Sequence, residues 1–275
     1  MRLKMIAVVC SFAVDAVLAD TTPIMVSLFD PAQLPSGKYD VMGLRFSALF
    51  GECHDFTGLD IGLVQKSTGD FTGISVGGVL NNVKGQACGA QVGGVGNVAG
   101  DVYGMQGGGL FNVSDSMYGM QCGYINWASN VRGVQVGDVN MVAYSCKKKL
   151  VFGDICGVQL GVLNWVDSAY GMQIGCMNMI EGGNVDGIQI AAYCNVIAYS
   201  GVMKGVQLGG FGNLTTNVHG VQIGGLINFA KSLNGVQIGL FNLADTVDGG
   251  IQIGLWNHIK KNGWAKNLPI ANGGF

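Results

Sequence analysis

The chain has 275 residues, of which 49% are hydrophobic and 12% are charged, and its formal net charge is -2. Glycine is abundant at 47 residues and proline is rare at 4, whereas disordered and linker chains usually enrich both residues together. The apolar content therefore excludes a disordered chain. The balanced charge argues against nucleic-acid binding, which needs a clustered basic face.

The N-terminus has the pattern of an export signal. Arg2 and Lys4 precede an apolar stretch from Ile6 to Leu18, and small residues end at Ala19. We therefore predict a signal peptide over residues 1–19 that is absent from the mature protein. No later segment reaches the roughly 18 unbroken apolar residues of a transmembrane helix.

Residues 20–57 are expected to form an N-terminal leader or capping segment, because the repeat that fills the rest of the chain starts after them. The repeat reads Gly, apolar, Gln, apolar, Gly, one to three further residues and Asn, as in GVQIGLFN at Gly235 to Asn242. Two degenerate copies start at Gly58 and Gly73. Clear copies start at Gly89, Gly104, Gly119, Gly133, Gly157, Gly171, Gly187, Gly205, Gly220, Gly235 and Gly250.

The repeat array spans residues 58–257 and carries two nearly invariant amide positions. The glutamines are Gln91, Gln106, Gln121, Gln135, Gln159, Gln173, Gln189, Gln207, Gln222, Gln237 and Gln252. The asparagines are Asn97, Asn112, Asn126, Asn140, Asn164, Asn178, Asn195, Asn213, Asn228, Asn242 and Asn257. One insertion, 141–156, contains three consecutive lysines and is expected to be a loop with a solvated tip. Residues 258–275 are expected to cap the C-terminal end.

The repeat predicts an all-β fold. Val or Ile alternates with Gln and Gly, which is the period of a strand with one apolar face, and the segments after each Asn are too short for a helix. We predict a β-solenoid with about 13 coils of about 15 residues, because stacked coils place like residues in columns and amides bond along such columns. The alternative is a transmembrane antiparallel β-barrel, whose strands also alternate apolar and polar residues.

The repeats resemble the leptospiral-type surface-repeat proteins. The resemblance is carried by GLDIGLV at Gly58 to Val64, by the GVQIGLFN-like units and by the ending GIQIGLWNHIKKNG…LPIANGGF. The segment from Pro23 to Phe46 is similar to the opening segment of that family. The resemblance implies an exported, surface-associated protein without an assigned biochemical activity, and it supplies no catalytic residues.

The cysteines do not predict a disulfide framework. Loss of Cys10 with the signal would leave an odd number, and no C-x-x-C occurs. Several cysteines stand where other repeats have Val, Ile or Leu, so we expect small buried apolar residues. A bridge between Cys146 and Cys156 across the insertion stays open. The remaining seven are Cys53, Cys88, Cys122, Cys146, Cys156, Cys176 and Cys194.

The sequence predicts no catalytic, cofactor-binding or metal-binding residue. The one cluster with suitable ingredients is Glu52-Cys53-His54-Asp55, but adjacent residues on a strand point in different directions and zinc ligands are usually spaced as pairs across a turn. We therefore expect a polar turn there. Aromatic residues recur beside the repeat Asn and are expected to stack and close the edge of the core: Trp127, Trp165, Trp256, Phe111, Phe229 and Phe241.

The expected function is that of a non-enzymatic, exported repeat protein of the cell surface, outer membrane or periplasm, with a structural or binding role. Repeat arrays commonly bind through one extended face. The expected partner is a surface ligand or an envelope protein, not a nucleic acid, and association with the outer membrane is open. The alternative is an outer-membrane barrel that forms a channel or anchor. An enzyme ranks third, because no acid–base pair or nucleophile set emerges.

Overall fold

The computed structural model describes residues 21–146, 149–263 and 265–274, so the predicted signal peptide lies outside the described residues. Every helix or strand assigned in these ranges is a β-strand. None of the described segments forms a helix long and apolar enough to cross a bilayer. The described chain divides into two compact units, one ending at Gly109 and the other starting at Leu110.

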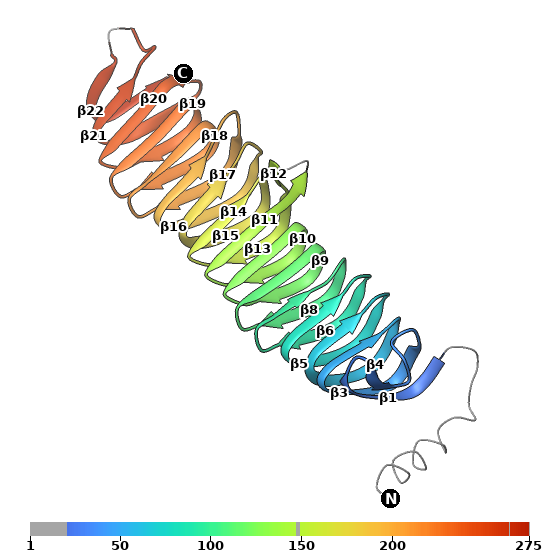
Figure 1. Ribbon diagram of the computed structural model, residues 1–275. Helices are drawn as coiled ribbons and strands as arrows, with labels where there is room; N and C mark the ends of the chain where they lie inside the picture. Colours follow the sequence, from blue (N-terminus) through green and yellow to red (C-terminus); the bar gives the residue numbers. More distant parts are fainter. Residues whose placement is uncertain (1–20, 147–148, 264, 275) are drawn as a thin grey trace, which may run out of the picture. The chain divides into compact units, whose positions relative to one another are not determined.

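The first unit is a stack of parallel coils (Figure 1). Strand β1 pairs with β3, β3 with β4 and β4 with β5 in parallel, and β5 then pairs with both β6 and β7. The short β2 folds back antiparallel on β1 at the N-terminal edge. The strands are β1 (Thr21–Phe29), β2 (Ala32–Leu34), β3 (Asp40–Cys53), β4 (Phe56–Ser67), β5 (Phe71–Val83), β6 (Ala87–Gly93), β7 (Gly96–Val98) and β8 (Val102–Gly108).

The second unit has the same parallel stacking and ends in an antiparallel strand, β22, that pairs with β21. Its strands are β9 (Phe111–Cys122), β10 (Ile125–Val136), β11 (Val139–Cys146), β12 (Lys149–Phe152), β13 (Asp154–Leu160), β14 (Leu163–Val166), β15 (Ser168–Ile180), β16 (Val185–Ile197), β17 (Val202–Gly209), β18 (Gly212–Gly224), β19 (Ile227–Ile238), β20 (Phe241–Val247), β21 (Gly250–Ile259) and β22 (Asn267–Gly274).

Equivalent residues of successive repeats lie side by side in each unit. In the second unit Gln121 pairs with Gln135, and in the first unit Gln91 pairs with Gln106. The predicted β-solenoid is therefore confirmed. The antiparallel barrel alternative is wrong, because neighbouring coils run in the same direction with like residues in register. A fifteen-residue period can produce this register only if each repeat completes one turn of the chain.

The stack begins earlier than the first repeat identified in the sequence. Gly43 of β3 pairs with Gly58 of β4, and Thr21 of β1 pairs with Asp40 of β3. Part of the segment expected to lead into the array therefore already has the coil geometry. The cap at the other end is antiparallel: Gln252 pairs with Asn272, whose side chain donates to the carbonyl of Ala265 at 2.9 Å.

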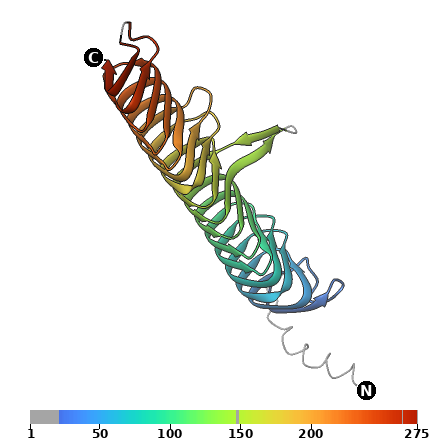
Figure 2. The same cartoon turned by 90° about the vertical axis from the view of Figure 1, so that its left-hand side faces the viewer.

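Most of the insertion at 141–156 is a β-hairpin within the second unit, and its first and last residues belong to the coils. β11 and β12 pair antiparallel from Ala143–Phe152 to Cys146–Lys149, and Figure 2 shows the hairpin projecting from the coils. The expectation of a loop is wrong for most of this segment, because β11 and β12 pair with each other as antiparallel strands. Lys147 and Lys148 lie outside the described residues. The coils continue beneath the hairpin, since β10 pairs directly with β13.

The interior of each coil has an apolar end and an amide end. Two positions before the first repeat glycine, the side chains are buried and apolar, as at Val131, Ile155 and Leu233. The repeat Gln and Asn, which lie farther along the coil, are also buried, with exposed fractions near zero. The apolar residues that alternate with Gln consequently face outward. At the amide end of each coil, polar side chains therefore face the interior and apolar side chains face outward.

Candidate functional site

The repeat asparagines form a continuous hydrogen-bonded column inside the second unit. The Nδ2 group of Asn213 donates to Oδ1 of Asn228 at 2.9 Å, and that of Asn228 donates to Oδ1 of Asn242 at 2.9 Å. Each Nδ2 group also donates to a backbone carbonyl of the next coil, as from Asn228 to Ile238 at 2.8 Å. Because donors and acceptor are all used, the amides can be buried at little cost.

The repeat glutamines form a second column with the opposite direction. Nε2 of Gln237 donates back to Oε1 of Gln222 at 2.7 Å, whereas each asparagine donates forward to the next coil. The amide dipoles of the two columns therefore oppose each other. Two column-end atoms that the structure describes have no hydrogen-bond partner, Nε2 of Gln91 in the first unit and Oε1 of Gln252 in the second.

Replacing Asn228 by leucine is expected to lower the free energy of unfolding by about 3 kcal/mol, because burying unpaired amide groups costs about 1–3 kcal/mol each. The variant leaves the donor of Asn213, the acceptor of Asn242 and the carbonyl of Ile238 unpaired. Urea unfolding measures the loss. The matched control is Asn234→Leu in the same strand, an exposed site where we expect a change within about 0.5 kcal/mol. Equal losses in both variants would refute the role of the column.

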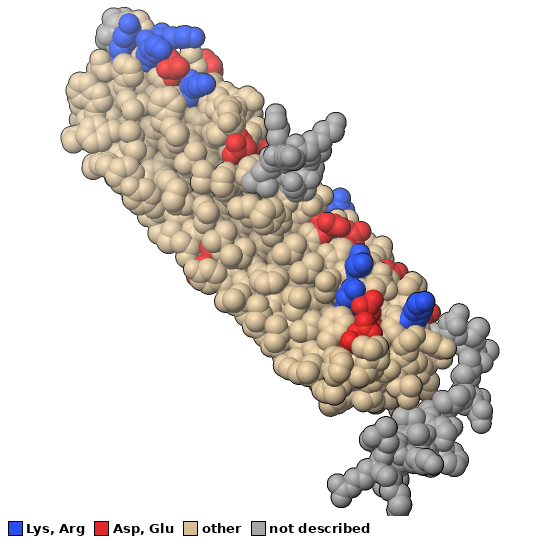
Figure 3. Space-filling view, in the orientation of Figure 1, with Lys and Arg blue, Asp and Glu red and all other residues tan. Residues whose placement is uncertain are grey.

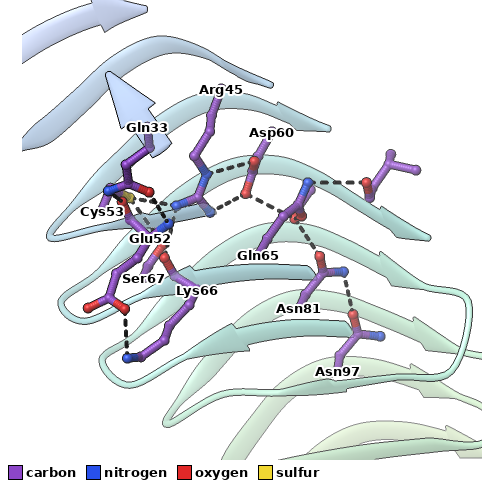
Figure 4. Close-up of polar contacts among 12 residues, drawn as sticks. Gln33, Arg45, Glu52, Cys53, Asp60, Gln65, Lys66, Ser67, Asn81 and Asn97 are labelled. Atoms are coloured by element: carbon purple, nitrogen blue, oxygen red, sulfur yellow. Dashed lines mark hydrogen bonds and ion pairs between the residues drawn. The ribbon is translucent and has the colours of Figure 1, made fainter. Parts of the chain in front are cut away.

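An ion pair replaces the amides at the start of the first unit (Figure 4). Arg45, Asp60, Ser75 and Gln91 occupy one column in successive coils. Nε of Arg45 donates to Oδ1 of Asp60 at 2.8 Å, and Nη2 donates to Oδ2. Both side chains are 1% exposed. The column therefore holds opposite charges inside the coil, where each one satisfies the other.

The guanidinium of Arg45 has further partners that fix its position. Nη1 donates to Sγ of Cys53 at 2.8 Å and to the carbonyl of Lys66 at 2.9 Å, and the Phe56 ring lies 5.1 Å from the guanidinium carbon. Although burial lowers the pKa of Arg45, hydrogen bonding and the charge of Asp60 raise it above its ordinary value. Burial raises the pKa of the Cys53 thiol, against the opposing charge of Arg45. Cys53 is a buried, protonated thiol and offers no accessible nucleophile.

The four residues Glu52-Cys53-His54-Asp55, expected to form a polar turn, do not all converge: only His54 and Asp55 come together, with Nδ1 of His54 3.5 Å from Oδ1 of Asp55. Cys53 points inward, whereas Glu52 pairs with Lys66 at 2.9 Å and His54 is exposed. The residue that sequence reasoning missed is Asp40, one coil earlier. Its Oδ1 lies 2.9 Å from Nδ1 of His54 and accepts the backbone N–H of Asp55 at 3.1 Å.

Asp40, His54 and Asp55 each offer one ligand atom, and these atoms lie within 4.8 Å of one another. Carboxylate oxygens and an imidazole nitrogen at this spacing could hold a divalent cation. The same contacts also belong to a backbone-capping column: Oδ1 of Asp55 accepts the N–H of Asp70 at 2.8 Å, and Oδ1 of Asp70 accepts the N–H of Gln86 at 2.8 Å. The carboxylates at this edge therefore already have a structural role in closing the coils.

The hydrogen bond from Asp40 and the charge of Asp55 raise the pKa of His54 above its ordinary value. Because the pKa is higher in the folded than in the unfolded chain, this pairing stabilises the fold below the unfolded pKa and the stabilisation is lost as pH rises through the folded pKa. Titration of the His54 ring by NMR measures the shift. Asp40→Asn keeps the acceptor for Asp55 but removes the charge, and it is expected to lower the pKa of His54. An unchanged titration would contradict the pairing.

The cysteines differ from the expectation that they are buried apolar residues. Only Cys53 is buried among those whose side chains are described; Cys194 is half-buried, and Cys88, Cys122, Cys156 and Cys176 are exposed. The prediction is wrong for these because their positions face outward: Cys122 pairs with Val136, and Cys88 and Cys156 lie in the column of Tyr103 and Tyr170. Cys156 is a free thiol, and the side chain of Cys146 lies outside those described.

A shallow groove of about 330 Å³ lies on one side of the second unit. The Arg132 guanidinium carbon is 6.0 Å from the centre of the Tyr118 ring, and Asp154 lies in the same groove. Its lining consists of Ser116, Met117, Tyr118, Asn130, Val131, Arg132, Asp154, Cys156 and Tyr170. The groove contains one cation, one carboxylate and two phenol rings, which is a mixed polar surface rather than an enclosed site.

The largest exposed feature of the second unit is apolar. We call it the apolar corner: the outward side chains from the residue before each repeat Gln to the residue after each repeat Asn. Its large members are between 36% and 67% exposed. They are Leu110, Tyr124, Ile125, Val162, Ile174, Ile188, Tyr193, Phe211, Leu214, Ile223, Ile238, Leu240, Phe241, Ile253, Leu255 and Trp256.

The apolar corner contrasts with the rest of the surface. Figure 3 shows charged side chains gathered along one edge of the molecule and a wide adjoining surface that carries almost none. Phe241 and Trp256, expected to close the core, are 41% and 46% exposed and belong to the corner instead. Trp165 also lies on the outside, with its ring 4.6 Å from that of Phe152. The predicted aromatic core edge is therefore an outer surface.

Comparison with protein-family models, curated proteins and solved structures gives no match for this chain.

Proposed function

We propose that this chain is an exported, non-enzymatic envelope protein that acts by offering a long repeated surface for binding. The observation that carries the proposal is the apolar corner of the second unit. Its exposed members amount to on the order of 1,000 Å² of apolar surface, whereas the largest patch on a typical monomer is about 300–600 Å². An exposed patch of this size marks an interaction site.

The other features support a binding role over catalysis. Cys53 and Arg45 are buried around Asp60, where no substrate can reach them. His54 and Asp40 lie on an open edge in a pattern that caps backbone N–H groups. The export pattern of residues 1–19 and the resemblance to surface-repeat proteins support an envelope location.

Expression of the full chain in a bacterium with two membranes tests the location. We expect the envelope fraction to contain a chain that starts near Asp20, as read by N-terminal mass spectrometry. The matched control is Val8→Asp/Val9→Asp, which interrupts the apolar stretch and should leave the chain in the cytoplasm with Met1 or Arg2 at its start. A wild-type chain that stays in the cytoplasm uncleaved would overturn the proposed export.

A further inference from the structure

We infer that the apolar corner of the second unit lies in the surface of a lipid bilayer, with the charged edge of that unit in water. The inference rests on the envelope role proposed above and names its partner as the uncharged acyl and glycerol region of a membrane. It follows from four features of the second unit: an inverted polarity, the near absence of charge, satisfied backbone groups and the shape of the corner.

The polarity of the coil is inverted at the corner. Gln237 and Asn242 are fully buried, while Ile238, Leu240 and Phe241 around them are 38–46% exposed. At the other end of the same coil the arrangement is ordinary, with Leu233 buried and the charged Lys231 exposed. A surface with apolar groups outside and polar groups inside is suited to an apolar medium. One end of the coil therefore matches lipid and the other end matches water.

The corner of the second unit carries one charged residue, Asp138. Specific protein interfaces typically include polar contacts, about one hydrogen bond per 100–200 Å². The outward side chains here are almost entirely aliphatic or aromatic, so nothing would fix the register of a protein partner. Tyr118 and Tyr170 lie at one margin of the corner, in a column that also holds Arg132, Asp186 and Lys204, and Trp127 and Trp165 lie at the other margin. Such margins of amphipathic and charged residues are found where proteins meet the membrane surface.

The backbone at the corner is hydrogen-bonded from coil to coil. The N–H of Leu226 donates to the carbonyl of Phe211 at 2.8 Å, that of Phe241 to Leu226 at 2.8 Å and that of Trp256 to Leu240 at 2.9 Å. Turns in soluble proteins commonly leave such groups to water. Because unsatisfied backbone groups cost several kcal/mol in hydrocarbon, this internal pairing is the condition for placing a bend in lipid.

The apolar surface continues around the bend onto both flanking strands. Ile223 and Ile238 lie on the strand before the bend, Leu240 lies at the bend, and Leu214 lies on the strand after it. A flat, rigid protein surface would contact one flank only. A fluid bilayer covers the bend and both flanks together. The expected depth is that of other interfacial elements, about 5–10 Å.

Vesicle flotation tests the inference with the purified full chain and phosphatidylcholine vesicles. The test variant is Phe211→Gln/Leu240→Gln/Leu255→Gln, at side chains that are 43%, 46% and 67% exposed in the corner. The matched control is Tyr199→Asn, which removes a 72% exposed ring at the opposite edge. We expect at least a tenfold loss of vesicle-bound protein for the test variant and no change for the control, at both low and high salt. Circular dichroism verifies that each variant is folded.

Quenching by brominated acyl chains locates the contact. Trp256 is 46% exposed in the corner, so wild-type fluorescence should fall on binding, and Trp256→Phe should reduce that fall and leave the part that comes from Trp127 and Trp165 at the margin. Equal binding by the triple variant, or quenching that Trp256→Phe does not reduce, would overturn the inference. So would a chain that forms dimers and leaves vesicles unbound, which would assign the corner to a second copy. These outcomes are independent of export, because the vesicle experiment uses purified protein.

Discussion

Replacing Gly220 by alanine is expected to lower the free energy of unfolding by about 4 kcal/mol, the sum of backbone strain and overpacking. Gly220 has φ +148°, which residues with a Cβ rarely adopt, and a Cβ there would lie 2.1 Å from the carbonyl oxygen of Gly205. The two glycines are paired in adjacent coils. Because coil spacing is set by the strand ladder, the coils cannot separate to make room.

The control for this prediction is Gly182→Ala. A Cβ at Gly182 would have its nearest neighbour, Oδ1 of Asp167, at 3.7 Å, which is an ordinary contact. We expect a change within about 0.5 kcal/mol or a slight gain from the stiffer unfolded chain. Urea unfolding measures both variants, and hydrogen exchange should show faster opening of β17 and β18 in Gly220→Ala, because coils interact chiefly with their neighbours. Similar stabilities for the two variants would refute the close approach.

The parallel register was predictable from the sequence because most repeats are close to fifteen residues long. Gln207, Gln222 and Gln237 are each fifteen residues apart, and only one turn per repeat places them in a single column. The insertion did not disturb this prediction. Its β-hairpin leaves and re-enters the coil at the same place, so Gln135 still pairs with Gln159.

The alternation of residues did not predict which face of each strand is buried in the coil. The two-residue period of a strand places Val236 and Gln237 on opposite sides. It does not show which of the two side chains faces the interior of the coil. The stacking of the coils makes Gln237 the buried residue. Its amide is hydrogen-bonded to those of Gln222 and Gln252, so its burial leaves no polar group unpaired. The cysteine prediction failed for this reason: Cys122 pairs with the outward Val136 and shares its exposure to solvent.

Two further side-chain pairs were not predicted because their members come from different coils. Asp40 joins His54 from fourteen residues away, one coil earlier. Arg45 and Asp60 were also overlooked, because neither stands in a clear copy of the repeat. The signal was available in the alignment of GLRFS with GLDIG, which places opposite charges in the column that later holds glutamine.

Replacing Asp60 by asparagine is expected to lower the free energy of unfolding by about 3–5 kcal/mol, because it leaves the buried charge of Arg45 without its partner. The pair is 1% exposed at both side chains, so water cannot take the place of the carboxylate. The matched control is Glu52→Gln, which breaks the ion pair with Lys66. Both of those side chains are 27% exposed, and we expect a loss below about 1 kcal/mol. Urea unfolding of the two single variants gives the comparison.

The double variant Arg45→Gln/Asp60→Gln separates a need for charge from a need for hydrogen bonding. Later coils hold Gln in this column, and Nε2 of Gln106 donates to Oε1 of Gln91 at 3.0 Å without any ion. Buried ion pairs can be replaced by well-fitting neutral groups at little cost. We therefore expect the double variant to recover most of the stability that Asp60→Asn loses. If it is as unstable as Asp60→Asn, the column needs the guanidinium itself, through its bonds to Cys53 and the Lys66 carbonyl, and the equivalence of the first coils with the later ones fails.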